Sequence, residues 1–216
     1  MYLRVKRVLS VVLALLGLIF LSPVFLIIMV AIKLDSKGPV FFRQKRVGKN
    51  KTHFEILKFR TMRVDAPKDA PTHLLQDPEK WITRVGKFLR KTSLDELPQL
   101  INVLKGDMAI IGPRPALWNQ FDLIAERDKY GANDVLPGLT GWAQIHGRDE
   151  LPIEEKARLD GEYVQKITLW MDIACFLRTI VVVARQEGVA EGSRGNDAPK
   201  AQAAGKAQNQ SRPGLM

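Results

Sequence analysis

An uncharged run of 25 residues, from 8 to 32, constrains this chain more than any other feature of its sequence. Eighteen of these residues are Val, Leu, Ile or Phe, so transfer of the run into a bilayer is favourable by about 5 to 11 kcal/mol. As a straight helix it would measure about 37 Å, longer than a hydrocarbon core of about 30 Å. Such runs are rare in soluble cores, and no small-residue cleavage site follows this one, which disfavours a signal peptide. The run therefore predicts a membrane segment.

The flanks of the run and the pair at its middle leave two topologies open. Arg4, Lys6 and Arg7 precede it, and further basic residues follow it, so both flanks prefer the cytoplasm. Pro23 cannot donate to the carbonyl four residues earlier, whereas the Ser22 hydroxyl can satisfy a freed backbone group. A re-entrant helix–break–helix would keep both flanks on one side. A kinked spanning helix fits the same residues.

The charge and composition of the whole chain limit the classes of binding partner and indicate where its segments begin and end. The net charge of +10 leaves nucleic acid, an anionic membrane surface and phosphorylated substrates as partner classes. A single cysteine excludes an internal disulfide, and three distant histidines offer no ordinary zinc ligand spacing. Beyond residue 192 almost nothing is apolar except Ala. We expect a membrane hairpin at 1–35, one domain at 36–191 and a disordered tail at 192–216.

Periodicity within 36–191 predicts a mixed fold, mostly α with one short β-hairpin. The hairpin is expected at 39–47 and 52–60, around a Gly-containing turn. An apolar stripe of Ile82, Val85, Phe88 and Leu89 indicates an amphipathic helix, either at a membrane interface or on a protein surface. The helix at 167–185 carries charges that favour the membrane interface or a buried core over a span. The helices are expected at 79–91, 93–105, 115–129, with Leu117, Phe121 and Ile124 on one face, 152–165 and 167–185.

The densest group of polar residues runs from Lys91 to Gln99. Ser93 and Glu96 match a capping box, with Ser93 as N-cap, although Pro98 requires the helix start to be bent or shifted. Asp95 and Glu96 lie about 100° apart on a helix, so both can border one pocket. A helix start favours an ionised carboxylate, which can attack phosphorus or bind Mg²⁺. Capping and catalysis both remain interpretations of this segment.

Two turns offer further candidates. Pro113 and Pro115 restrict the backbone around Arg114, which indicates either a rigid guanidinium for phosphate or simply a stiff turn before a helix. The glycine-rich segment 137–144, followed by Arg148, could approach a ligand closely or form an ordinary turn.

These motifs together resemble the bacterial sugar transferase family, specifically the small monotopic phosphoglycosyl transferases. The resemblance runs from about Arg4 to Arg185 and leaves out the tail. It rests on the basic start, Ser22-Pro23, Gly38-Pro39-Val40, Lys58-Phe59-Arg60-Thr61-Met62, the segment from Arg90 to Gln99, Gly106-Asp107-Met108, Gly112-Pro113-Arg114-Pro115 and the segment from Pro137 to Gln144.

The resemblance implies an enzyme of the bacterial inner membrane, on its cytoplasmic face. Such an enzyme transfers a phosphosugar from a UDP-sugar to polyprenol phosphate and releases UMP, the first membrane step of O-antigen, capsule or glycoprotein glycan assembly. The apolar hairpin is then re-entrant, 36–191 is the cytoplasmic catalytic domain, and amphipathic helices lie at the interface. The chain is expected to be the minimal catalytic form.

The resemblance also assigns roles to single residues. Asp95 is the nucleophile that forms a phosphosugar-aspartate, and it contacts Mg²⁺ as the metal ligand. Glu96 assists metal binding or proton handling. The expected phosphate contacts are Lys58, Arg60, Arg90, Arg114 and Arg148.

Other functions remain in competition with this one. A membrane-anchored nucleic-acid or lipid-binding module could use the same basic residues, although no nucleic-acid motif is present and we expect no nucleic-acid partner. A spanning sugar-phosphate transferase would need several long apolar runs. Anionic inner-membrane lipids are expected partners, a homodimer stays open, and the sequence does not select the sugar.

Overall fold

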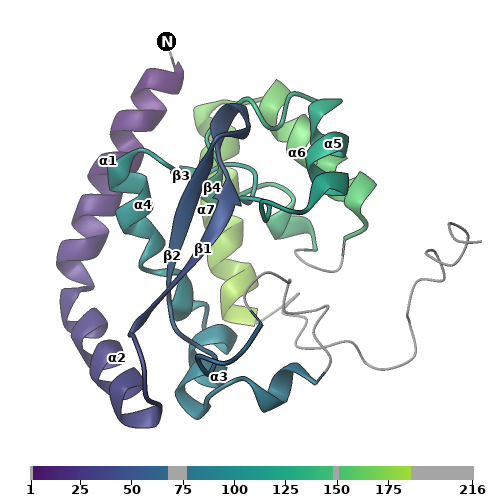
Figure 1. Ribbon diagram of the computed structural model, residues 1–216. Coiled ribbons are helices and arrows are strands. Elements are labelled where there is room, and N and C mark those ends of the chain that lie inside the picture. The colour runs from purple at the N-terminus through teal and green to yellow at the C-terminus, as the bar shows by residue number, and fades with distance from the viewer. Residues whose placement is uncertain (1, 68–76, 148–150, 186–216) are drawn as a thin grey trace, which may run out of the picture.

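Figure 1 shows the computed structural model of the chain, which describes residues 2–67, 77–147 and 151–185. The apolar run forms two helices, α1 (Tyr2–Phe20) and α2 (Ser22–Asp35), bent by 63° at their junction. The Ser22 hydroxyl donates a 2.8 Å hydrogen bond to the Ile19 carbonyl. This is the carbonyl that Pro23, four residues later, cannot reach because it has no N–H. The predicted break at Ser22-Pro23 is confirmed.

The length of these helices determines whether one of them could cross a membrane. In the described part of the chain no single helix is long and apolar enough to cross a bilayer, and α1 with α2 is a bent pair that satisfies both criteria together. One face of α1 packs on the rest of the molecule through small residues, Ser10, Ala14 and Gly17, which let the helices approach closely. Its outward face exposes large apolar side chains, among them Leu13 and Leu16.

The predicted hairpin is confirmed. Strands β1 (Phe41–Val47) and β2 (His53–Phe59) pair antiparallel, with Phe42 opposite Lys58. The turn η1 (Lys49–Lys51) contains Asn50 at φ 53°, a left-handed conformation that Asn tolerates better than most residues.

Both edges of this hairpin are covered. On the β2 edge, the Asn102 side chain of α4 (Gln99–Lys105) donates to the Glu55 carbonyl at 2.8 Å and accepts from the Leu57 N–H at 2.9 Å. On the β1 edge, the Val47 N–H donates to the Ala116 carbonyl at 2.9 Å. The strands are thereby fixed between α4 and the segment that precedes α5 (Phe121–Asp128).

Three predicted helices begin later than expected: α3 (Arg84–Lys91), α4, which starts at Gln99 and not at Ser93, and α5. Residues 79–91 divide into a 3-10 turn, η3 (Pro78–Lys80), and α3, which Thr83 caps. The cause is a β-bridge between Ile82 and Met62, which keeps the chain extended before Thr83. Phe88 is 58% exposed and Leu89 is buried, so only part of the predicted stripe reaches the core.

The helix predicted at 115–129 begins only at Phe121, because Leu117 forms a β-bridge with Arg46. The expectation that Leu117, Phe121 and Ile124 share one helical face is therefore wrong, and Phe121 is exposed. The sequence also gave no sign of a second, parallel pair of short strands, β3 (Ala109–Ile111) and β4 (Gly138–Thr140). The fold is thus mostly helical with two small sheets.

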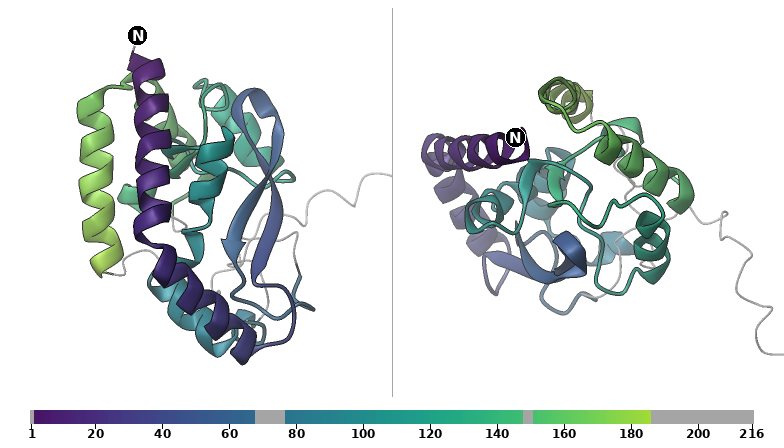
Figure 2. Two further views of the ribbon diagram at one scale, coloured as in Figure 1. Left: turned by 90° about the vertical axis from the view of Figure 1, so that its left-hand side faces the viewer. Right: turned by 90° about the horizontal axis from the view of Figure 1, so that it is seen from above.

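The last two helices, α6 (Ile153–Gln165) and α7 (Leu169–Arg185), match their predictions. Figure 2 shows α7 beside α1, and hydrogen bonds join the two helices. Asp172 of α7 accepts from Tyr2 at 2.6 Å, from Lys6 at 2.5 Å and from Tyr163 at 2.6 Å. We call these four residues the Asp172 cluster. The predicted tail at 192–216 lies outside the described residues.

Candidate active site

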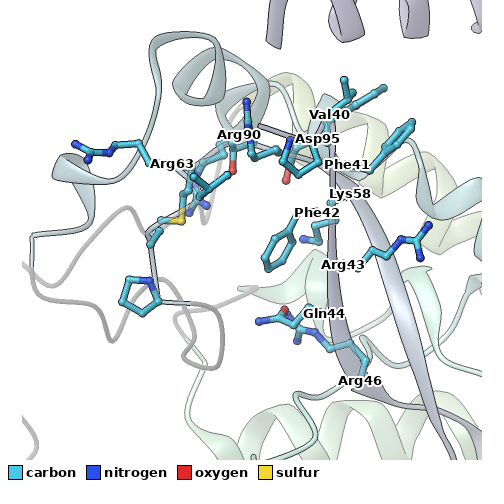
Figure 3. Close-up of a pocket in the computed structure, with 18 residues that line it drawn as sticks. Val40, Phe41, Phe42, Arg43, Gln44, Arg46, Lys58, Arg63, Arg90 and Asp95 are labelled. Carbon is cyan, nitrogen blue, oxygen red and sulfur yellow. The ribbon is translucent and has the colours of Figure 1, made fainter. Parts of the chain in front are cut away.

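A pocket that we call the main pocket collects basic side chains around one acidic side chain. Its volume is about 560 Å³, and it lies among β1, β2, the segment after β2, α3 and η4 (Leu94–Glu96). Figure 3 shows Asp95, Lys58 and Arg90 together at one end of it. Such an excess of positive charge suits an anionic ligand. The cationic residues that line it are Arg43, Arg46, Lys58, Arg60, Arg63 and Arg90.

Asp95 lies in a 3-10 turn and not in the first turn of an α-helix. Ser93 has a left-handed backbone, with φ 56°, and its side chain makes no capping bond. Helix α4 begins only after Pro98, so the predicted capping box of Ser93 and Glu96 is wrong. The physical reason is that a proline inside a helix removes a donor and clashes with the preceding turn. The tighter turn places Asp95 in the pocket wall, 9% exposed.

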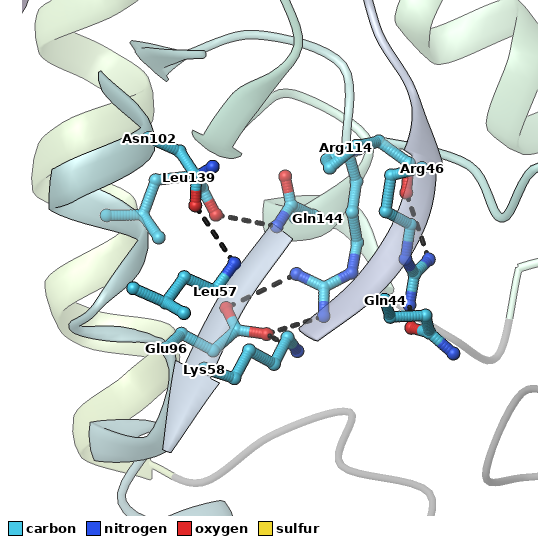
Figure 4. Close-up of polar contacts among 10 residues, drawn as sticks. Gln44, Arg46, Leu57, Lys58, Glu96, Asn102, Arg114, Leu139 and Gln144 are labelled. Carbon is cyan, nitrogen blue, oxygen red and sulfur yellow. Dashed lines mark hydrogen bonds and ion pairs between the residues drawn. The ribbon is translucent and has the colours of Figure 1, made fainter. Parts of the chain in front are cut away.

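Glu96 is tied to two other segments (Figure 4). The Lys58 ammonium group of β2 donates to Glu96 Oε1 at 2.7 Å. The Arg114 guanidinium donates to Oε1 at 2.6 Å and to Oε2 at 3.3 Å. Charge-assisted pairs of this kind hold their partners in defined positions. Glu96 therefore fixes Lys58 and Arg114 beside its neighbour in the chain, Asp95.

Asp95 differs from Glu96 because no described residue donates a hydrogen bond to it. Burial raises the pKa of Asp95 to about 6, against the opposing charges of Lys58, Arg90 and Arg114. Burial alone would also raise the pKa of Glu96, but the charges and hydrogen bonds of Arg114 and Lys58 outweigh it and hold that pKa well below its usual value. Near neutral pH both carboxylates are ionised, and only Asp95 is open to a new partner.

The other predicted phosphate contacts differ in their surroundings. Arg90 of α3 lines the main pocket. Arg60 lines it too, but its guanidinium donates to the carbonyls of Ser36 and Lys37, at 2.7 Å each. These bonds attach the end of α2 to the pocket, so Arg60 has a structural role, and its phosphate contact stays a prediction. Arg148 lies outside the described residues.

Arg46 was not among the predicted site residues, yet it supports the turn that carries Arg114. One of its nitrogens donates to the Pro115 carbonyl at 3.1 Å, and another donates to Gln44 Oε1 at 2.6 Å. Figure 4 shows this arrangement beside the Glu96 contacts. Its position near the site could have been found from the sequence, because the predicted hairpin places Arg46 and Gln44 on the strand opposite Lys58.

The glycines at 137–144 permit main chain to pack on main chain. A Cβ on Gly138 would lie 2.1 Å from the Gly112 nitrogen, and one on Gly141 would lie 2.1 Å from the Gly112 oxygen. Only residues without a side chain fit there, so packing accounts for this segment, which ends in the 3-10 turn η5 (Gln144–His146). The described residues contain no group of three or more His, Cys, Asp or Glu side chains that could hold a metal ion by themselves.

Comparisons with known proteins agree with the sequence motifs. A family model for bacterial sugar transferases matches residues 1–186. An Escherichia coli K12 UDP-glucose:undecaprenyl-phosphate glucose-1-phosphate transferase is 41% identical over 188 residues, 81% of this chain and 39% of the relative. An Aeromonas hydrophila UDP-N-acetylgalactosamine-undecaprenyl-phosphate N-acetylgalactosaminephosphotransferase is 40% identical over 185 residues, 83% of this chain and 43% of the relative.

A Bacillus subtilis protein described as an uncharacterized sugar transferase is 39% identical over 184 residues, which is 85% of this chain and 89% of the relative. The chain thus spans most of the B. subtilis relative and about two fifths of the E. coli and A. hydrophila relatives. Because the family match covers most of the chain, including the main pocket, the chain belongs to the bacterial sugar transferase family.

Proposed function

We propose that this chain transfers a sugar phosphate from a UDP-sugar to undecaprenyl phosphate and releases UMP. The observation that carries the proposal is Asp95, a buried carboxylate to which no described residue donates a hydrogen bond, in a pocket whose other charged lining residues, among those described, are all cationic. The names of the E. coli and A. hydrophila relatives supply the nucleotide sugar and the lipid phosphate. The two names differ in the sugar, so the proposal is limited to the class of UDP-sugars.

In the first step, an Asp95 oxygen attacks the phosphorus that bears the sugar. The bond from that phosphorus to the oxygen shared with the UMP phosphate breaks, and UMP leaves with that oxygen. In the second step, a phosphate oxygen of undecaprenyl phosphate attacks the same phosphorus, and the bond to Asp95 breaks. The product is undecaprenyl-diphospho-sugar, and the carboxylate is restored.

Charge balances in both steps without any proton transfer when undecaprenyl phosphate is a dianion. This supports a revised role for Glu96, which the resemblance assigns to metal binding or proton handling. Both of its oxygens already accept from Lys58 or Arg114, so we assign Glu96 as a positioning residue. Lys58 and Arg114 then stabilise the charge that develops on the phosphate oxygens, and Arg90 adds a further cation.

Mg²⁺ is part of the proposal, and it fits the pocket if Asp95 and the substrate phosphates supply its ligands together. Mg²⁺ is usually held by one or two carboxylates together with substrate phosphate oxygens and water, and Asp95 is a carboxylate without a protein donor. Asp95 would hold the ion jointly with the substrate diphosphate. When bound, the ion neutralises the diphosphate and stabilises the leaving group.

The reaction is tested with purified chain, undecaprenyl phosphate and a panel that includes UDP-glucose and UDP-N-acetylgalactosamine. Repeated turnover, with more than one UMP released per chain, is expected for at least one sugar and only when both substrates are present. Without undecaprenyl phosphate, we expect about one UMP per chain and a phosphosugar on the peptide that contains Asp95. Absence of release with every sugar would overturn the reaction, and release only with both substrates present would overturn the covalent intermediate.

We also propose that α1 and α2 form a re-entrant element on the cytoplasmic side of the inner membrane. The support is the 63° bend, the exposed apolar face of α1 and the basic residues at both ends. A Leu3→Cys variant in a Cys175→Ser background should label weakly from the periplasmic side. Labelling should rise when Ser22→Ala and Pro23→Leu are added, because the helix then becomes continuous. Strong labelling without these two changes would contradict the re-entrant topology.

A further inference from the structure

A second pocket, which we call the N-terminal pocket, lies where α1 begins. Its volume is about 380 Å³, and it is formed by the start of α1, the hairpin turn, β3, residues 134–136 and the connection between α6 and α7. Figures 1 and 2 show the start of α1 and the hairpin turn at one end of the molecule and α3 at the other. Among the described residues, the two pockets share no lining residue.

Apart from its charged residues and Tyr163, the N-terminal pocket is lined by apolar side chains among the described residues. Leu3, Ile111, Leu136 and Ile167 bring hydrocarbon side chains from four separate segments. The Tyr163 hydroxyl, which also borders it, is engaged by the other members of the Asp172 cluster. A cavity of this composition favours a hydrocarbon group, since it offers no unpaired buried donor to a polar one.

The rim of the N-terminal pocket is cationic. Arg4 and Lys49 are exposed there, and neither side chain has a hydrogen bond or ion pair with a described residue. Arg7 donates to the carbonyls of Val103 and Met108, at 3.0 and 3.1 Å, which orients its guanidinium and leaves its charge uncompensated.

Two further charged residues determine the net charge of the rim. Lys6 also lines the pocket, but Asp172 already neutralises it. Asp134 is the acidic residue among the described lining residues. The rim therefore keeps a positive charge that is complementary to an anion.

The pocket adjoins an apolar surface. Leu3 is 60% exposed while it also lines the pocket, and Val8 and Leu9 continue the exposed apolar surface of α1. A molecule with an anionic head and a hydrocarbon chain matches this arrangement, in which a cationic rim leads to an apolar cavity and then to the apolar surface of α1. The match to a membrane lipid rests on the proposed location of α1 at the membrane, and the choice of a phospholipid over undecaprenyl phosphate rests on the proposed reaction.

We propose that the N-terminal pocket binds one anionic phospholipid. Its phosphodiester lies among Arg4, Arg7 and Lys49, and the first carbons of an acyl chain fill the cavity. A phospholipid is favoured over undecaprenyl phosphate because the reacting acceptor must meet Asp95, which lines the other pocket. The bound lipid would join α1 to the hairpin turn and to the α6–α7 connection.

The test counts lipids retained by the full chain in neutral detergent, by native mass spectrometry. We expect one phosphatidylglycerol per chain and at least fivefold less phosphatidylcholine. The double variant Arg4→Gln with Lys49→Gln should retain at least fivefold less phosphatidylglycerol. The matched variant Lys37→Gln with Lys105→Gln removes two exposed lysines outside the pocket and should stay within twofold of the unchanged chain. Equal losses in both variants, or equal retention of the two lipids, would overturn the site.

Competitors identify the source of the phosphate group. Inorganic phosphate at millimolar concentration should leave phosphatidylglycerol bound, because it lacks the hydrocarbon part, and displacement by it would overturn a lipid site. Displacement by an equimolar amount of undecaprenyl phosphate would show an acceptor site instead. Ile167→Trp should reduce retention by filling the cavity, and unchanged retention in a folded variant would contradict the proposal. UMP release without lipid retention would refute this inference alone, since the reaction does not depend on it.

Discussion

Two buried carboxylate clusters of the molecule differ in how completely their acidic groups are paired. In the Asp172 cluster, two tyrosines and one lysine donate to a single carboxylate. At the main pocket, Glu96 is paired just as fully, but its neighbour Asp95 accepts from no described residue. A carboxylate that accepts hydrogen bonds from several segments stabilises the packing of those segments. One that accepts none is costly to bury and leaves an anion available for chemistry.

The largest effect is expected from removing the unpaired charge. Asp95→Asn is nearly isosteric, so the fold should persist while the nucleophile is lost. UMP release should fall at least about 1000-fold, as is common when a nucleophile is removed. The measurement is UMP release by purified variant with a matching circular dichroism spectrum. More than a few percent of the original activity would contradict the assignment.

The same exchange in the Asp172 cluster should act on stability. Asp172→Asn leaves Lys6 buried without its counter-ion, so the free energy of unfolding should fall by about 3 to 5 kcal/mol. UMP release per folded chain should stay within about threefold, because no member of the cluster lines the main pocket. Denaturant unfolding in detergent measures the free energy of unfolding.

A double variant controls for burial of an unpaired charge. Lys6→Met with Asp172→Leu replaces the pair by apolar groups and should recover part of the lost stability, because Tyr2 and Tyr163 still lose their acceptor. If the double variant were less stable than Asp172→Asn, the ion pair itself, and not the unpaired lysine, would be the stabilising element.

Glu96→Gln tests whether Glu96 positions its neighbours or moves protons. The amide keeps the shape and removes the charge, so Lys58 and Arg114 lose part of their restraint, and kcat should fall about 10- to 100-fold. The charge of Glu96 raises the pKa of Asp95, so its removal should shift the acidic limb of the kcat/KM profile to lower pH. A limb that stays in place, or moves to higher pH, would contradict the positioning role.

The smallest effect is a gain in stability. The folded-state pKa of Asp95 is about 6 against an ordinary 3.8, so ionisation of Asp95 opposes folding. This cost grows from about pH 4 to about pH 6 and is fully present above. Asp95→Asn should therefore be more stable than the unchanged chain at pH 8, by about 1 to 3 kcal/mol, with little difference at pH 4. Equal stability at both pH values would mean that Asp95 is not strained by burial.

Elements with strong local signals could be predicted from the sequence. The Ser22-Pro23 break, the hairpin and the helices α6 and α7 follow from residues close together in the chain. The starts of α3 and α5 could not, because β-bridges of Ile82 and Leu117 to distant residues keep those segments extended. Strands β3 and β4, of three residues each, are too short to give a periodic pattern.

The candidate site was predictable as a set of residues but not as an arrangement. The Asp95-Glu96 pair and three of the cations could be named from motifs. The division of roles between the two carboxylates depends on Lys58 and Arg114, which come from segments 38 and 18 residues away from Glu96. The role of Arg60 depends on its bonds to the carbonyls after α2. Neither contact has a signature in the local sequence.

The amide of Asn102 has a consequence for how copies of this protein behave at high concentration. An open strand edge invites another chain to add a strand, which leads to edge-to-edge aggregation. Here the side chain of Asn102 occupies an N–H and a carbonyl on the outer edge of β2, and the backbone at Ala116 occupies the outer edge of β1. One amide and one loop thus block intermolecular pairing at the middle of β2 and at the end of β1.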